Sequence, residues 1–203
     1  SNPGGNIVFG FDALSAELDG HIGDSNHDTT FPMRNHVFGY EALKNNTAGA
    51  YNHAYGYRSM YSNTLGYYNS AFGARTLHSN TTGDYNVAMG SRSLYANTTG
   101  HKNVAIGNNS LSENTTASEN TAIGTYSLLN NTTGSRNTAL GSESLLTNTT
   151  GSYNMGIGYQ ALYSNTTADR NTGVGYQALA LNTTGTDNNA FGFCALCANT
   201  TGN

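Results

Sequence analysis

The chain has 203 residues, of which only 10% are charged, and its formal net charge at pH 7 is −4. With so few basic residues, the sequence has no basic patch that could bind nucleic acid and no polybasic segment that could bind a membrane surface. The sequence also shows no signal peptide and no apolar run long enough to cross a membrane. We therefore expect contact with neither nucleic acid nor membrane by this segment.

Residues 1–34 contain a degenerate unit followed by a spacer. The unit begins at Asn6-Ile-Val-Phe-Gly10 and reaches Leu14, after which residues 15–34 put twenty residues where a turn of eight is expected. Within the spacer, a cluster of imidazole and carboxylate groups suits zinc or another transition metal: His21, Asp24, His27 and Asp28. Two alternatives are a polar loop that caps the end of the fold and a site in which three chains bring His27 to a shared axis.

Residues 35–203 are ten consecutive units, each of seventeen residues, with no insertion or deletion between them. The consensus is N-x-A-φ-G-x-x-(A/S)-L-x-x-N-T-T-G-x-x, where φ is a large apolar residue. Four positions never change: the first Asn, the Gly at the fifth position, and the Asn-Thr pair at the twelfth and thirteenth. A strict period of this length is too short for a helical repeat or a propeller blade. It predicts an all-β, parallel β-solenoid of about eleven coils, counting the degenerate unit.

Each unit is expected to contain two short strands, such as residues 103–106 and 109–111. Gly107 would turn the corner between them with φ > 0, and the Asn-Thr-Thr segment would form a turn. The large apolar side chains at the fourth and ninth positions are predicted to fill the core. The small residues at the third and eighth positions are predicted to let a neighbouring chain approach. Since two large side chains per coil give a thin core, we expect an oligomer whose chains share it.

Several units resemble those of trimeric surface fibres. Residues 103–107 (NVAIG), 120–124 (NTAIG) and 137–141 (NTALG) resemble the head repeat of the YadA-like trimeric autotransporter adhesins. The string NMGIGYQALYSNTT, residues 154–167, resembles more closely the repeats of bacterial and phage surface fibres that end in an endosialidase-type intramolecular chaperone. This resemblance covers nearly the whole chain. It implies a left-handed β-roll, a homotrimer wound about one axis, and a role in adhesion at a cell surface or on a virion.

The autotransporter repeat is shorter and lacks the NTTG turn, which favours the fibre family. The first unit starts within six residues of the N-terminus, and the last stops before its period closes. We therefore expect a segment of a longer protein, with any export signal, anchor or chaperone outside it.

A column of arginines is the first candidate binding feature. Arg58, Arg75 and Arg92 share the seventh position of successive units, so in-register stacking would bring their charges together and call for an anion. That anion is either internal, from Glu41 or Asp84, or an acidic glycan held by bidentate contacts. The candidate ligand-binding residues are the three arginines and the aromatic residues near them: Arg58, Arg75, Arg92, Tyr57, Tyr61, His78 and Tyr95.

A cluster of tyrosines is the second candidate. Six fall within eighteen residues: Tyr51, Tyr55, Tyr57, Tyr61, Tyr67 and Tyr68. Such rings stack on sugars or fill protein interfaces, although exposed tyrosine also fits any strand surface. The Cys194-x-x-Cys197 pair lacks the context of a redox or zinc site, so we expect two ordinary thiols or a bridge between chains.

No triad, phosphate loop or nucleophile motif is present, so we expect no enzyme, no catalytic residue and no cofactor. The expected function is that of a trimeric adhesin segment, displayed outside the cell, that attaches to another surface through glycan. The alternatives are a purely structural shaft or phage tail-fibre part, an ice-binding solenoid built on the row of threonines at the thirteenth position, and a glycan-degrading fibre enzyme.

Overall fold

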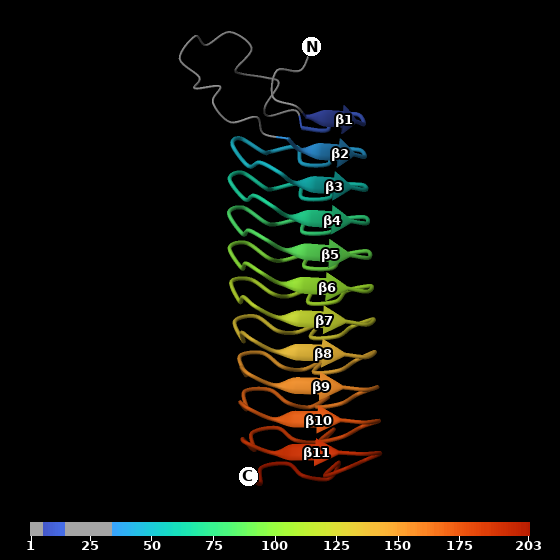
Figure 1. Ribbon diagram of the computed structural model, residues 1–203, viewed down its shortest axis with the longest axis vertical. Coiled ribbons are helices and arrows are strands. Elements are labelled where there is room, and N and C mark those ends of the chain that lie inside the picture. The colour runs from blue at the N-terminus through green and yellow to red at the C-terminus, as the bar shows by residue number, and fades with distance from the viewer. Residues whose placement is uncertain (1–5, 15–33) are drawn as a thin grey trace.

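The protein forms an elongated rod of stacked coils (Figure 1). The computed structural model describes residues 6–14 and 34–203. In these residues eleven strands form one parallel sheet in chain order, and there is no helix. The strands are β1 (Ile7–Phe9), β2 (His36–Phe38), β3 (His53–Tyr55), β4 (Ser70–Phe72), β5 (Val87–Met89), β6 (Val104–Ile106), β7 (Thr121–Ile123), β8 (Thr138–Leu140), β9 (Met155–Ile157), β10 (Thr172–Val174) and β11 (Asn189–Phe191). The expected all-β parallel solenoid is confirmed.

Equivalent residues of successive coils lie directly above one another. Strand β6 pairs with β7 so that Val104 is opposite Thr121, and Ala105 is opposite Ala122. The same offset, one full repeat of the sequence, holds for every pair from β2 to β11. Each position of the unit therefore forms a column along the rod. We number the columns from 1, at the invariant first Asn, to 17.

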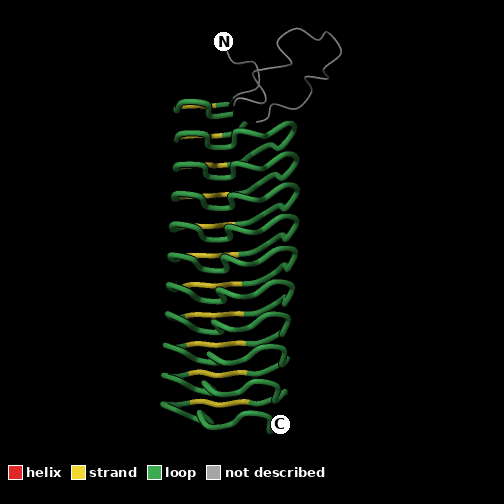
Figure 2. The backbone as a smooth tube through the Cα atoms, turned by 180° about the vertical axis from the view of Figure 1, so that it is seen from behind, coloured by secondary structure: helices red, strands yellow, loops and turns green. Residues whose placement is uncertain are grey.

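Each coil has one strand rather than the predicted two. Residues 109–111 form turns, and both Asn109 and Leu111 have a φ of 52°, in the left-handed region. These turns carry the chain back behind the strand (Figure 2), which closes the coil within a single short repeat. The turn backbone still joins the next coil, since the amide of Leu111 donates to the carbonyl oxygen of Ser127 at 2.9 Å. The corner glycine is confirmed, because Gly107 has a φ of 133°.

The predicted inward direction of column 4 is wrong. Side chains alternate along a strand, and it is column 3 that points inward: Ala105 and Ala122 are fully buried. Column 4 points out, and Phe38, Met89 and Phe191 are 57%, 47% and 71% exposed. Column 9 is buried as predicted in the described coils up to Leu179.

The interior is too narrow for two large side chains per coil. At Gly156, in column 3, even a Cβ would lie 2.6 Å from the Oγ of Ser144 and 3.0 Å from the carbonyl oxygen of Ala161. Both of those residues belong to column 8, so columns 3 and 8 face each other across the inside of one chain. The prediction that these small residues admit a neighbouring chain is therefore wrong.

Two columns of buried asparagine complete the interior. In column 12 the Asn114 amide donates to the Oδ1 of Asn97 at 2.8 Å and to the carbonyl oxygen of Ala117 at 3.0 Å. In column 1 the Asn103 amide donates to the same carbonyl at 2.9 Å, while its Oδ1 accepts the backbone N–H of Asn120 at 3.0 Å. Because buried polar groups need partners, these bonds account for the invariance of both asparagines.

Candidate functional site

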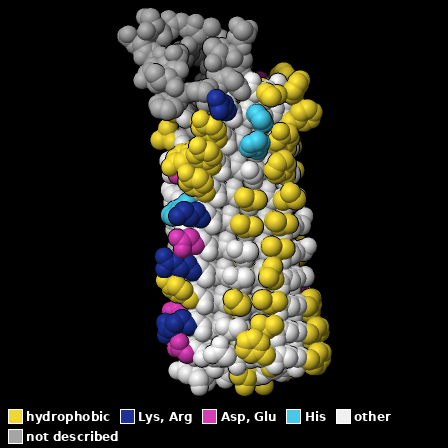
Figure 3. Space-filling model, viewed as in Figure 1, with side chains coloured by type: hydrophobic (Ala, Val, Ile, Leu, Met, Phe, Trp, Pro, Cys, Tyr) yellow, Lys and Arg dark blue, Asp and Glu magenta, His cyan; other side chains and the backbone are white. Residues whose placement is uncertain are grey.

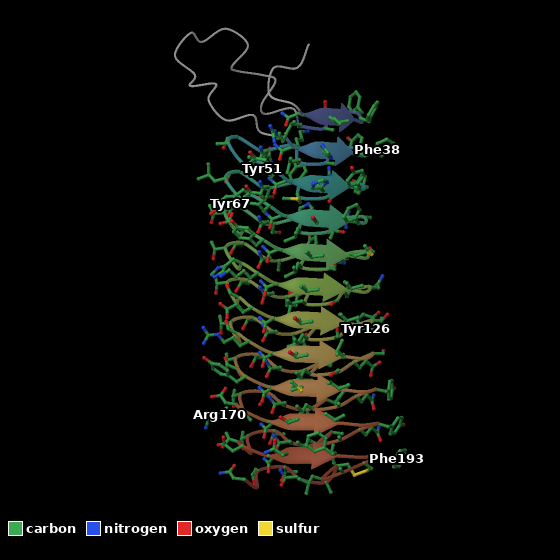
Figure 4. The ribbon with its side chains drawn as sticks, in the orientation of Figure 1. Phe38, Tyr51, Tyr67, Tyr126, Arg170 and Phe193 are labelled. Atoms are coloured by element: carbon green, nitrogen blue, oxygen red, sulfur yellow. A yellow bond between two sulfur atoms is a disulfide. The ribbon has the colours of Figure 1, made fainter. Side chains whose placement is uncertain are left out.

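The arginine column lies on one edge of the rod. Tyr126, which belongs to the same column 7, lies on the right-hand edge in Figure 4, together with Phe38 and Phe193. The guanidinium of Arg58 lies over the rings of Tyr57 and Tyr61, 5.3 and 5.4 Å from their centroids. Columns 6, 7 and 10 therefore meet on this edge, as the candidate site requires.

Arg58 has an internal partner, one of the two that the sequence suggested. Its Nε donates to the Oε2 of Glu41 at 2.6 Å, and the Nζ of Lys44 donates to the other oxygen at 2.7 Å. Glu41 is only 6% exposed. The hydrogen bond from Lys44, aided by Arg58, lowers the pKa of Glu41 against the opposing effect of burial. Asp84 does not join this cluster, because its carboxylate accepts the backbone N–H of Tyr67 at 2.9 Å.

Unlike Arg58, Arg75 and Arg92 have no acidic partner in the described residues. Both are exposed, and among the described residues neither forms an ion pair with a carboxylate. Aromatic rings hold them instead: the guanidinium of Arg92 lies 4.7 Å from the ring centroid of Tyr95, and that of Arg75 lies 5.8 Å from the centroid of Tyr57. Two supported, uncompensated positive charges thus stand on consecutive coils.

Column 10 forms an aromatic stack beside these arginines. His78 lies between Tyr61 and Tyr95, with ring centroids 5.2 and 5.1 Å away. Its Nδ1 is buried without a hydrogen-bond partner in the described part of the chain. Burial, followed by the charges of Arg58 and Arg75, lowers the pKa of His78. The imidazole is therefore neutral at neutral pH, and the arginines carry the positive charge of this edge.

The tyrosine cluster divides between two edges of the rod. Tyr57 and Tyr61 lie with the arginines, whereas Tyr51 and Tyr67 lie on the opposite edge in Figure 4. On that edge Tyr51 and Tyr68 stack with centroids 4.8 Å apart and planes 9° apart. Stacked neighbours cover one another's faces, so a sugar could stack only on the ring that ends each stack. The rest of each stack presents ring edges and hydroxyl groups.

Column 17, on this opposite edge, also carries paired charges. Arg136 bonds Glu119 at 2.7 Å, and Arg170 bonds Asp187 at 2.6 Å. Figure 3 shows the resulting alternation of basic and acidic side chains along one side of the rod. These pairs neutralise their own charge, so this edge is a weaker anion site than the one that holds Arg75 and Arg92.

Cys194 and Cys197 form a disulfide within the chain, which corrects the prediction of free thiols or a bridge between chains. They occupy columns 7 and 10, the same two columns that bring Glu41 to Lys44 and Arg58 to Tyr61. The separation of three residues between the two cysteines could therefore have predicted this disulfide, but only with the knowledge that columns 7 and 10 are neighbours around a turn.

The other predicted features have mixed outcomes. The spacer residues His21, Asp24, His27 and Asp28 lie outside the described residues. Within the described ranges no three or more His, Cys, Asp or Glu side chains gather as a metal site.

The hydroxyls of column 13, the row of threonines considered for ice binding, form hydrogen bonds within the chain, since Thr98 Oγ1 donates to the carbonyl oxygen of Thr115 at 3.0 Å. The described chain has no helix of the length and apolarity that a membrane span requires.

Sequence reasoning missed the outward apolar face of the strands. Column 4 carries a large apolar side chain in every described coil, and many of these are substantially exposed: Phe9, Phe38, Phe72, Met89, Ile123 and Phe191. The signal was the alternation within each three-residue strand, which places columns 2 and 4 on one face and column 3 on the other.

No protein-family model, curated protein or solved structure matches this chain.

Proposed function

We propose that this chain is a segment of a trimeric surface fibre that attaches to another surface by binding acidic glycan. The observation that carries the proposal is the pair of guanidiniums of Arg75 and Arg92, supported by aromatic rings and without carboxylate partners among the described residues. The backbones that carry them are one coil apart, about 4.8 Å, so the two side chains together suit a ligand that offers several acidic oxygens, such as a sialylated, sulfated or phosphorylated glycan. The resemblance of the repeats to surface fibres supports an extracellular location.

The outward apolar face supports assembly with further copies of the chain. Apolar side chains follow column 4 from Phe9 to Phe191, some of them exposed and the rest, such as Leu140 and Ile157, partly exposed, and an apolar surface of this kind marks an interaction site. A partner that covers it along the whole rod must repeat at the same rise per coil. A second copy of the chain meets that requirement. If three copies formed a left-handed roll about one axis, as the resemblance implies, column 4 of each chain would be buried against the other two.

A purely structural shaft, as in a phage tail fibre, is the second candidate. It is favoured by the paired charges of column 17, such as Glu119 with Arg136, because an edge that neutralises itself offers little to a charged ligand. Under this alternative the arginine edge would bind nothing, and attachment would reside elsewhere.

A glycan array separates the two candidates. The assembled protein is expected to bind sialylated or sulfated glycans in preference to their neutral parents, and raised salt should weaken that binding because the contact is ionic. Equal signals on neutral and acidic glycans, or no signal above background, would leave the shaft as the better account.

A further inference from the structure

Two histidines lie side by side on the outward face of the strands, away from the arginine edge. His36 on β2 and His53 on β3 are direct partners in the parallel register. Both are half-buried members of column 2. Their ring centroids are 4.8 Å apart, and their planes differ by 75°. Figure 3 shows two histidine side chains in contact near the N-terminal end of this face.

This separation matches the distance between two imidazoles that share one metal ion. A bond from zinc to an imidazole nitrogen is about 2.0–2.1 Å, which places each ring centroid about 3.2 Å from the ion. For cis ligand angles between square-planar and tetrahedral, two such centroids lie about 4.5–5.2 Å apart. The observed 4.8 Å falls inside that range.

The backbone holds the pair in place. The amide of His36 donates to the carbonyl oxygen of Asn52 at 2.8 Å, and that of His53 donates to Asn69 at 2.8 Å. Each histidine therefore stands on a hydrogen-bonded strand, so the direction in which each imidazole points is set by its own side-chain torsions. Ligands on regular elements of this kind form more precise sites than ligands on loops.

We propose that His36 and His53 form a bidentate site for a divalent transition-metal ion, with water in the remaining coordination positions. Two imidazoles suit Zn²⁺, Ni²⁺ and Cu²⁺, and affinity for nitrogen ligands is greatest for Cu²⁺. Mg²⁺ prefers oxygen ligands and should not bind here. The proposal does not depend on glycan binding, because the Arg75 edge is formed by other columns.

Calorimetric titration of the full chain with Cu²⁺ tests the site, in a His21→Ala/His27→Ala background that removes the spacer's imidazoles. His53→Ala is expected to weaken binding at least about tenfold, since losing even a group that orients a ligand costs that much. The same titration with Mg²⁺ should give no heat of binding. Cu²⁺ affinity that His53→Ala leaves unchanged would overturn the proposal.

A transplant tests the geometry without relying on the native pair. Thr121 and Thr138 are partners in the same column on β7 and β8. With His36 and His53 both replaced by Ala, Thr121→His/Thr138→His should restore Cu²⁺ binding, whereas Thr121→His alone should not. If the double replacement binds no better than the single one, in-register spacing does not create the site and the proposal fails.

Discussion

The carbonyl oxygen of Gly141 occupies the space in which a side chain on Gly124 would begin: a Cβ placed there would lie 2.5 Å from that oxygen. Gly124 also has a φ of 133°, which side-chain-bearing residues rarely adopt. The same relationship recurs one coil earlier, between Gly107 and the carbonyl oxygen of Gly124. Glycine is thus required in column 5 both by backbone conformation and by the close approach of the next coil.

Gly124→Val is expected to lower the free energy of unfolding by at least about 2 kcal/mol, because strain at positive φ adds to a steric clash with the next coil. Thr121→Val, in the same coil, is the control and should change it by no more than about 0.5 kcal/mol, since the site is outward-facing strand. Thermal denaturation of the two variants measures the difference. Equal melting temperatures would contradict the role assigned to the glycine.

Asn114→Ala tests the asparagine columns. It removes the donor to Asn97 and Ala117 and leaves the amide of Asn131 without the acceptor that it bonds at 3.1 Å. Each buried group left without a partner costs about 1–3 kcal/mol, so a loss of about 2–5 kcal/mol is expected. Thr116→Ala, two residues away and exposed, should be nearly neutral. Chemical denaturation compares them, and similar losses for both would show that the column contributes little.

His78 should make the fold less stable in mild acid. Because burial, with Arg58 and Arg75, lowers its pKa below the value of about 6.5 expected in an unfolded chain, the unfolded state binds the proton more readily. The stabilising contribution is therefore fully present above pH 6.5 and is lost as the pH falls through the folded-state pKa. His78→Phe keeps the stacked ring but removes the titration, so it should flatten the decline in melting temperature just below pH 6.5. An unchanged decline would assign the effect to other groups.

Ile123→Asp tests assembly without entering the core. Ile123 is 37% exposed in column 4, so a charge there should prevent other copies from covering the column while each coil stays folded. Light scattering should give about three times 21.4 kDa for the parent and a lower mass for the variant. Leu128→Asp, in the buried column 9, should instead unfold the chain, and Thr116→Asp should change neither property. A folded parent monomer at micromolar concentration would refute the trimer.

Arg75→Ala should weaken attachment to acidic glycan more than Arg136→Ala, because Arg136 is already paired with Glu119. The loss should be greatest at low salt, where the ionic contact is least screened. Binding of both variants to an immobilised sulfated glycan provides the measurement. If Arg75→Ala leaves binding intact while raising the melting temperature, the arginine column is a strained stack and not a binding surface.

The strict repeat period was enough to predict the solenoid, the corner glycines and the buried leucines, because each follows from repetition in one register. It did not reveal the turn at residues 109–111. The left-handed residue Leu111 carries none of the Gly or Asn signal by which such turns are recognised. The period also could not show that column 4 points outward, because apolar side chains are normally expected to be buried. The three-dimensional structure is needed to see that the interior is full, as the closeness of Ser144 to Gly156 shows.

Part of the candidate site was predicted correctly, because residues in the same column stack in register. Arg58, Tyr57 and Tyr61 come together because their columns are neighbours, and the pairing of Arg58 with Glu41 was one of two stated alternatives. The tyrosine cluster was misleading because closeness along the chain says nothing about which edge of a coil a residue occupies. Tyr51 and Tyr57 are close in sequence yet lie on different sides of the rod.

Exact stacking also makes the length of this rod adjustable in whole coils. Excision of residues 120–136 would set Asn137 where Asn120 now stands, with the Oδ1 of Asn103 again accepting its backbone N–H and Gly141 again following Gly107. Unequal recombination between such repeats would shorten or extend the protein while keeping the asparagine and glycine contacts between coils, although outward pairs such as Glu119 with Arg136 would change. Reach and surface chemistry can therefore evolve separately: the number of coils sets the first, and the side chains in the outward columns set the second.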